Sequence, residues 1–397
     1  MTEQSIALQR LDGRPARLAD QESTRAIRVM WRSRDFRFLM AGQVAGLLGN
    51  HLYLIALPWL ILQLTGDVVA MGTAILSSGV SRIGLMLMGG VASDRLSSRT
   101  VMLGSNIARV GLLALLAWLV LAGQVELWML YGFSFTYGLI EAFLAPARSA
   151  IVPQIVRPDS LQMANVVASG LEQGCGLIGP VAAGFAIAWA NGALAGTGAG
   201  TPGLHGVGVA LGLDALATLA SVVMLWHVSL RQCQATVKQV WPSEDVLSSV
   251  KEAMAYVWQH GTLRNCILMI VAINMLTAGP IGVGLPALAG TRLAGGAAAL
   301  GALTSALGAG ALLGAMLAGL LPQPESRQMG GICVVIIGMC SAGLLSLACA
   351  TSVSVAVLAT LAVGAAISYL NVTVVTRTQS HAPGPLMGRI MSLVALK

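Results

Sequence analysis

The sequence carries very little charge for its length. Only 10% of its 397 residues are Asp, Glu, Lys or Arg, whereas soluble globular chains contain about 25%. Hydrophobic residues make up 56% of the chain, and the mean hydropathy is +0.79. So few charged side chains are not enough to cover the surface of a soluble protein of this size. The sequence therefore predicts a chain that is surrounded mainly by lipid.

Several site patterns are also absent from the sequence. The six cysteines form no C-x-x-C pair and have no histidine at a spacing typical of metal sites. The chain has no G-x-x-x-x-G-K-[ST] loop for ATP, no H-E-x-x-H and no G-x-S-x-G. We therefore expect no metal, no cofactor, no enzymatic activity and no ATP-driven pumping.

Long apolar runs fill most of the chain. A helix needs about 20 apolar residues to cross a bilayer. Ten runs meet this length: 38–64, 68–92, 100–122, 126–147, 163–189, 207–229, 263–289, 294–321, 329–350 and 353–376. An eleventh run begins near Met387. The prediction is an all-α, polytopic membrane protein with ten complete transmembrane helices and the start of an eleventh.

The runs divide the chain into four parts. We expect an Arg-rich cytoplasmic segment (1–37), a six-helix half (38–229), a cytoplasmic linker (230–262) and an incomplete second half (263–397). Within the linker, apolar residues recur at helical spacing, which predicts a short amphipathic helix on the membrane surface; a plain solvated linker is the alternative. The helical face consists of Val246, Val250, Ala253, Met254 and Val257.

Basic residues gather in alternate loops. Eight arginines precede the first run, and Arg95, Arg157, Arg231 and Arg327 follow runs two, four, six and eight, whereas the opposite loops hold only Arg292. This asymmetry predicts a cytoplasmic N-terminus and linker in a bacterial-type inner membrane. The net charge of +7 is thereby explained by topology, and we expect no nucleic acid partner.

An internal repeat relates the two parts of the chain. Adding 229 to Gly72, Gly79 and Gly90 of the second run gives glycines of the eighth run, and the same shift carries Arg148 onto Arg377. One shared offset predicts two similar six-helix halves, with a substrate path between them near the bilayer midplane. A complete second half needs roughly 40 more residues, so we expect a truncated version of a twelve-helix protein.

The segment after the second run reads G-V-A-S-D-R-L-S-S-R, from Gly90 to Arg99. It resembles the loop between helices two and three of the major facilitator superfamily, with matches at Gly90, Asp94, Arg95 and Arg99. Serines stand where that family usually has a glycine and a further base. The resemblance implies a gate that steadies one conformation, made of charge-assisted hydrogen bonds. The alternative is that the two arginines serve only as positive-inside anchors.

Two further segments narrow the resemblance. The stretch A-P-A-R-S-A-I-V-P, with Pro146 and Arg148, and the tail G-R-I-M-S-L, with Gly388 and Arg389, look like the macrolide- and enterobactin-exporter branch of that superfamily. Where that branch often has Gly-Asp in its first helix, this chain has Asn50 after a glycine. The resemblance implies a transporter that exports a small hydrophobic or siderophore-like molecule.

The fifth run contains G-P-V-A-A-G, from Gly179 and Pro180 to Gly184. It resembles the end of the antiporter motif, G-P-x-x-G-G, with alanine in place of one glycine. Glycine and proline together create a bend and a close helix contact. The motif favours export over uptake, although glycine and proline are frequent in membrane helices in any case.

Ionisable side chains inside the runs are the candidates for proton or substrate handling. Each costs about 2.5–3.5 kcal/mol at a bilayer centre and should therefore face the bundle interior and find a partner. Glu141 and Glu172 are the preferred proton carriers, because a carboxylate in a low-dielectric interior can load and release a proton. Arg82 is a candidate partner for either acid, and Asn50 belongs to the same set. Structural ion pairing is the alternative for all; the remaining members are His51, Arg109 and Asp214.

These features favour proton-coupled efflux of a small molecule by alternating access, with the lipid bilayer and protons as partners. Two alternatives stay open. One is uptake or lipid-related transport on the same fold. The other is a membrane protein that does not transport, because the second half is incomplete.

Overall fold

The computed structural model describes residues 31–95, 97–156, 161–194, 204–228, 254–293, 295–321 and 328–381. Within these ranges, side chains are described except for residues 86–95, 149, 150, 153, 161–163, 165, 166 and 379–381. The predicted linker helix falls largely outside them. Only residues 254–259 of it are described, and they are helical, with Val257 buried and Met254 exposed.

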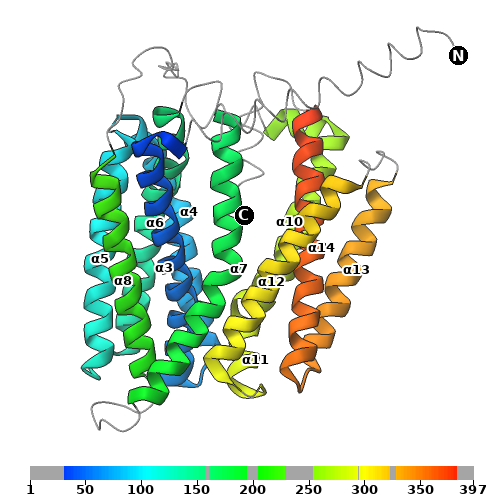
Figure 1. Ribbon diagram of the computed structural model, residues 1–397. Helices are drawn as coiled ribbons and strands as arrows, with labels where there is room; N and C mark the ends of the chain where they lie inside the picture. The colour runs from blue at the N-terminus through cyan, green and yellow to red at the C-terminus, as the bar shows by residue number, and fades with distance from the viewer. Residues whose placement is uncertain are drawn as a thin grey trace, which may run out of the picture.

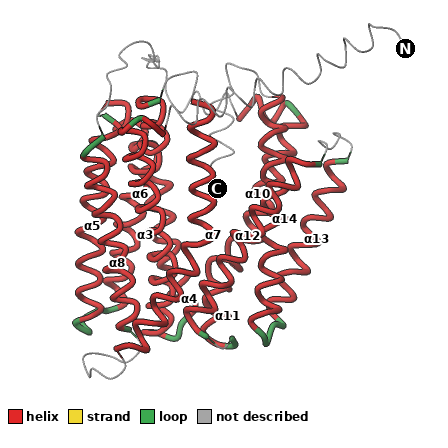
Figure 2. Tube along the Cα trace, in the orientation of Figure 1, coloured by secondary structure: helices red, strands yellow, loops and turns green. Residues whose placement is uncertain are grey.

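Every regular element in the described part of the chain is a helix, as predicted (Figure 2). The first six are α3 (Arg34–Thr65), α4 (Val68–Arg95), α5 (Ser98–Leu121), α6 (Leu127–Ile155), α7 (Leu161–Leu194) and α8 (His205–Trp226). They are followed by α10 (Gly261–Gly279), η2 (Pro280–Gly284), α11 (Leu285–Thr291), α12 (Gly296–Leu320), α13 (Met329–Ala348) and α14 (Val353–His381). Within the described residues, these helices form ten spans that are long and apolar enough to cross a membrane, which confirms the ten predicted runs.

The seventh span is not one continuous α-helix. After α10 the chain forms one turn of π-helix, η2, and then the short helix α11. Pro280 has no N–H group, and prolines interrupt the regular hydrogen-bond ladder of a helix. By contrast, α3 in the first half contains Pro58 and remains helical over 32 residues.

Successive helices run up and down, so that all loops lie at two ends of the bundle (Figure 1). We name the end where α8 stops and α10 starts the insert end, at the top of Figure 1, and the other the opposite end. The first six helices form one group and the later helices a second group. In Figure 1, α7 and α12 face each other where the groups meet.

Glycines let helices approach closely within the first group. α8 packs against both α3 and α5. On α3, a Cβ added at Gly42 would lie 3.2 Å from the Cβ of Met224, and one added at Gly49 would lie 2.3 Å from Asp214 Oδ1. Small residues at a helix interface permit close packing in membranes, and here they bring the backbone of α3 directly against side chains of α8.

A second glycine contact joins the two groups, and we call it the α7–α12 seam. A Cβ added at Gly184 would lie 2.5 Å from the carbonyl oxygen of Ala297, and one added at Gly301 would lie 2.5 Å from that of Pro180. The Val181 N–H donates a hydrogen bond to Ser305 Oγ across the seam at 3.0 Å. The seam therefore consists of backbone against backbone, with no room for larger side chains.

Exposed tryptophans mark both ends of the bundle. Trp118, Trp128 and Trp189 lie near the opposite end, and Trp226 and Trp258 lie near the insert end. Tryptophan is enriched at the two membrane–water interfaces because its ring is apolar and its N–H is polar. The two belts fit a bundle that spans a bilayer along its helix axes.

Candidate functional site

Three charged side chains from three helices meet near the middle of the first group. Arg109 lies halfway along α5, Glu141 halfway along α6, and Asp214 near the middle of α8. We name these three residues the charged cluster. All three were among the ionisable side chains that the sequence placed inside apolar runs, where a charge is stable only with a partner.

Arg109 and Asp214 form a fully enclosed ion pair. The Arg109 Nη2 donates to Asp214 Oδ1 at 3.0 Å and to Oδ2 at 3.4 Å. The hydroxyl of Thr218, one turn further along α8, also donates to Oδ1 at 3.1 Å. The two charged side chains are 1% and 0% exposed. Asp214 therefore accepts three hydrogen bonds, and Arg109 is held firmly to α8.

Glu141 is held much more loosely than Asp214. Its Oε1 lies 3.5 Å from Arg109 Nη1, which is long for a hydrogen bond, and 18% of its side chain is exposed. One guanidinium thus faces two carboxylates, so the cluster carries a net charge of −1 when all three groups are ionised. Glu141 is therefore the less buried and less tightly bound of the two carboxylates.

Two tyrosines cover the cluster on the side toward the opposite end. Tyr137 lies one turn before Glu141 on α6, and its ring centroid is 5.1 Å from Arg109 Cζ, within the range of a cation–π contact. The ring stacks on that of Tyr53 from α3, with centroids 3.7 Å apart and planes 10° apart. Its hydroxyl donates a hydrogen bond to Asn50 Oδ1.

The adjacent residues Gly49 and Asn50 on α3 contact both the ion pair and the stacked tyrosines. Gly49 leaves the space that Asp214 occupies, since an added Cβ would overlap Oδ1. Asn50 supplies the acceptor for Tyr137. The structure therefore links Asn50 to Glu141 through Tyr137 and Arg109. The sequence had placed Asn50 and Glu141 in one candidate set without a connection between them.

The partner of Glu141 is Arg109, whereas the sequence offered Arg82. Arg82 and Glu172 are both exposed, and within the described ranges neither side chain forms an ion pair. The sequence contained one usable signal for the observed pairing. Arg109 and Asp214 are the only charges well inside their respective runs, and the third and sixth helices are neighbours in the fold.

Glu172 has a separate location. It lies one turn before Gly176 on α7, and a Cβ added at Gly308 of α12 would lie 2.8 Å from the Gly176 carbonyl oxygen. Of the seam contacts made by glycines of α12, the contact between Gly308 and Gly176 lies nearest the insert end. Glu172 is exposed just beyond the place where the two groups touch.

The other predicted site residues are distributed as follows. Arg99 caps the C-terminus of α8, because its Nη2 donates to the Trp226 carbonyl at 2.6 Å and its Nε to that of Leu225 at 3.3 Å. Gly90, Asp94 and Arg95 belong to the last turns of α4, but their side chains are outside the described set. The predicted gate is thus placed only at Arg99, which joins α5 to α8.

The predicted bend motif lies where three helices meet. A Cβ added at Gly179 would lie 2.6 Å from His51 Cδ2 of α3, while Pro180 and Gly184 contact α12 at the seam. Of the predicted loop motifs, Pro146 and Arg148 lie on α6 and are half-buried. Gly388 and Arg389 lie outside the described residues.

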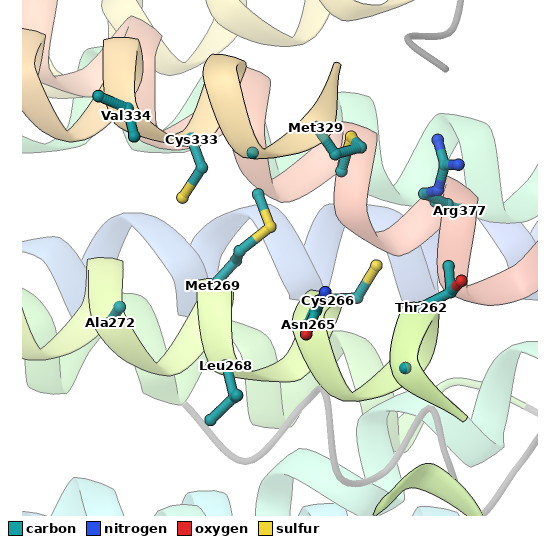
Figure 3. Close-up of a pocket in the computed structure, with 12 residues that line it drawn as sticks. Thr262, Asn265, Cys266, Leu268, Met269, Ala272, Met329, Cys333, Val334 and Arg377 are labelled. Atoms are coloured by element: carbon teal, nitrogen blue, oxygen red, sulfur yellow. The ribbon is translucent and has the colours of Figure 1, made fainter. Parts of the chain in front are cut away.

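The second group contains a cavity of about 630 Å³ between α10 and α13 (Figure 3). Four sulfur-bearing side chains line it together with polar groups, among them Asn265, Thr262 and Arg377. No carboxylate is among its lining residues. Residues 263–397 contain a single acidic residue, Glu325. Its sulfur-bearing residues are Cys266, Met269, Met329 and Cys333.

The comparison with protein families identifies one family. The model of the family described as transmembrane secretion effector matches residues 29–396. No curated protein sequence matches the chain.

Solved structures of membrane transporters share the fold. A bacterial homologue of the human lysosomal transporter Spinster, in an inward-facing and unoccupied conformation, matches with a TM-score of 0.68 at 14% identity, covering 92% of this chain and 79% of its own. A D-xylose–proton symporter matches with a TM-score of 0.67 at 14% identity, covering 92% and 87%. An inward-facing bacterial homologue of the iron transporter ferroportin matches with a TM-score of 0.63 at 15% identity, covering 91% and 87%. At these identities the likeness concerns the fold, which is that of the major facilitator transporters.

Proposed function

The chain belongs to the transmembrane secretion effector family, and from this premise we propose that it exports a small hydrophobic or siderophore-like molecule in exchange for protons. The observation that supports this most directly is the unequal binding of the two carboxylates in the charged cluster. Asp214 binds Arg109 through two hydrogen bonds in a fully buried pair. Glu141 is less buried and only weakly bound, so in this proposal it is the group that takes up and releases a proton.

The coupling follows from the charge of the cluster. When Glu141 is ionised, the buried cluster carries one negative charge, which is costly in a low-dielectric interior. Protonation makes the cluster neutral and removes that cost. A conformation that encloses Glu141 is therefore favoured by the protonated form, and one that exposes Glu141 to water is favoured by the ionised form. The proton gradient thereby biases which side of the transporter is open.

Closure at the opposite end depends on contacts between the two groups. Besides the α7–α12 seam, Trp59 of α3 packs against the start of α12: a Cβ added at Gly296 would lie 3.1 Å from Trp59 Cζ2. Likewise, one added at Gly290 of α11 would lie 2.5 Å from Leu62 Cδ2. Alternating access requires these contacts to separate, so that the second group rocks away from the first at this end.

The positive-inside pattern places the insert end in the cytoplasm. The present conformation is then closed toward the outside, and the likeness to two transporters described as inward-facing supports this assignment. In this conformation Glu141 is the partly exposed carboxylate of the cluster. Glu172, next to the inner limit of the seam, is a second candidate for contact with protons or substrate as the halves close.

A transport assay in membrane vesicles tests the proposal. We expect inside-out vesicles containing the protein to accumulate the dye ethidium when their lumen is acidified, and a protonophore to abolish the accumulation. Glu141→Gln should reduce the gradient-driven rate about 100-fold or more, since proton-transfer groups contribute roughly 10²–10⁴-fold. The matched control is Glu126→Gln, because Glu126 begins the same helix at the exposed opposite end.

Two results would contradict the proposal. Undiminished gradient-driven accumulation in Glu141→Gln would remove Glu141 as the proton carrier. Proton-driven dye entry into right-side-out vesicles would indicate uptake and would contradict export. A solved structure of the same fold is named as a D-xylose–proton symporter.

A further inference from the structure

Several buried polar atoms around the charged cluster have no hydrogen-bond partner among the described residues. They are the Tyr53 hydroxyl, the Ser134 hydroxyl, Glu141 Oε1 and Arg109 Nε. Tyr53 is 4% exposed and Ser134 is 0% exposed. Buried hydroxyls are almost always satisfied in folded proteins, so this group of unpaired atoms requires an explanation.

The unpaired hydroxyls lie on one side of the cluster. Ser134 precedes Glu141 by seven residues on α6, which is about 10 Å toward the opposite end. Tyr53 follows Asn50 by three residues on α3, again toward the opposite end. The two hydroxyls are close enough to interact with each other, although neither forms a hydrogen bond of ordinary geometry. They thus extend from Glu141 toward the face that the seam closes.

We propose that Tyr53 and Ser134, together with buried water, form a proton relay between Glu141 and the opposite end. This inference rests on the proposed role of Glu141 as the proton carrier. Buried water commonly satisfies polar groups of this kind and makes about three hydrogen bonds. The four unpaired atoms supply both donors and acceptors for it.

Proton transfer along the relay leaves its side chains and water chemically unchanged. Each hydroxyl donates its proton to the neighbouring water while it accepts another from the water behind it. After one passage the two side chains and the water have their original composition, and one proton has moved along the path. Tyr53 and Ser134 are therefore positioning residues for proton transfer and are not themselves oxidised or ionised.

The relay gives Glu141 two separate proton routes. One route would reach its side chain, which is 18% exposed, directly, and the other would run along the two hydroxyls toward the opposite end. On the side toward the opposite end, the stacked rings of Tyr53 and Tyr137 cover the cluster, so the proposed path there runs over the hydroxyls. Removal of the hydroxyls should therefore slow proton exchange from one side only, whereas a purely structural role would predict no such sidedness.

The experiment follows proton exchange at Glu141 without any substrate. The protein is placed in vesicles sorted so that its N-terminus faces either outward or inward, and the external pH is changed abruptly. Time-resolved infrared spectroscopy records the band of protonated carboxyl groups, which Glu141→Gln assigns. We expect Tyr53→Phe and Ser134→Ala each to slow proton exchange from the opposite end about tenfold. This is less than the full contribution of a positioned proton-transfer group, because water can partly replace the lost hydroxyl. From the insert end, we expect a change of less than about twofold.

Matched variants separate the relay from packing. Tyr53→Phe retains the ring that stacks on Tyr137, so the fold is preserved. Thr136→Ala removes a hydroxyl from the same helix α6 that bonds within its own helix, to the Gly132 carbonyl; this variant should match the wild type. Ser134→Thr keeps a hydroxyl and should restore the rate that Ser134→Ala loses.

The possible failures can be told apart. Wild-type exchange from both ends in Tyr53→Phe/Ser134→Ala, with a band that Glu141→Gln abolishes, would overturn the relay alone. Equal slowing from both ends would also overturn it, because the hydroxyls would then act on the cluster as a whole. A band that persists in Glu141→Gln would contradict the proposed function, and the relay that rests on it would fall as well.

Discussion

The two halves of the chain share a backbone arrangement and differ in their chemistry. The offset of 229 that relates the glycines carries Arg109 onto Gly338 and Glu141 onto Leu370. The first half therefore has a charged cluster at its centre, where the second half has a glycine and a fully buried leucine. Residues 263–397 contain only Glu325 as an acid. The spaced glycines thus recur in both halves, whereas within the described residues the charged cluster belongs to the first half.

The halves also differ in the continuity of their corresponding helices. α3 remains a single helix through Pro58, whereas its counterpart changes to the π-turn η2 before it reaches α11. π-Turns within α-helices are frequent at functional sites. We therefore propose different roles for the two halves. The charged first half takes up and releases protons, and the second half, with its interrupted helix, moves relative to it during transport.

The largest expected effect comes from breaking the ion pair of the first half. Asp214→Ala leaves Arg109 buried without its main partner, and removal of one member of a buried pair costs about 3–5 kcal/mol. Thermal unfolding in detergent should show a marked loss of stability. The control is Glu172→Ala on α7, because Glu172 is exposed and forms no ion pair within the described residues; this variant should unfold like the wild type. An unchanged midpoint for Asp214→Ala would mean that the pair is not what holds α5 to α8.

A smaller effect is expected from filling the space beside that pair. The Cβ of Gly49→Ala would lie 2.3 Å from Asp214 Oδ1, and such overpacking typically costs about 1–3 kcal/mol. Gly79→Ala in α4 is the control, because nothing lies within 4 Å of a Cβ added there. Unfolding of the two variants compares the sites directly. Equal stability would show that α3 can move away from α8 without penalty.

The seam between the halves can be tested in a similar way. Gly301→Ala places a Cβ 2.5 Å from the Pro180 carbonyl oxygen, which should disfavour the conformation closed at the opposite end by about 1–3 kcal/mol. Distances between spin labels on α7 and α12 should then shift toward the separated form. Gly319→Ala, which meets nothing within 4 Å, serves as the control on the same helix. Identical distance distributions would indicate that the seam does not limit closure.

The smallest effect is expected in the cavity of the second half. A maleimide should react with Cys333, which lines the cavity, faster than with Cys340, which is fully buried. If proton handling is confined to the first half, the modification should change the infrared response of Glu141 by less than about twofold, within the weak coupling expected of sites without shared partners. Loss of the Glu141 infrared response on labelling would contradict the proposal that proton handling is confined to the first half.

Some of the site was accessible from the sequence and some was not. Glu141 was recognised because an ionisable side chain inside an apolar run is costly and therefore requires a role. Asn50 was recognised because it stands where the resembled exporter branch often has an aspartate. The choice of Arg109 in place of Arg82 could not be predicted, since both are bases inside runs. The partner is decided by which helices are neighbours and how each is rotated about its axis. Tyr53 and Ser134 gave no signal, because a single hydroxyl within a run costs too little to be noticed.

The sequence by itself determined the ten membrane-spanning helices and the glycine repeat. These are local properties: twenty apolar residues are stable in lipid as a helix wherever that helix lies in the bundle. Only the tertiary structure decided that Arg109 binds Asp214 and faces Glu141 beneath two stacked tyrosines. Those contacts join residues up to 105 positions apart, and they exist only once the helices have packed and the glycines of α3 have admitted α8.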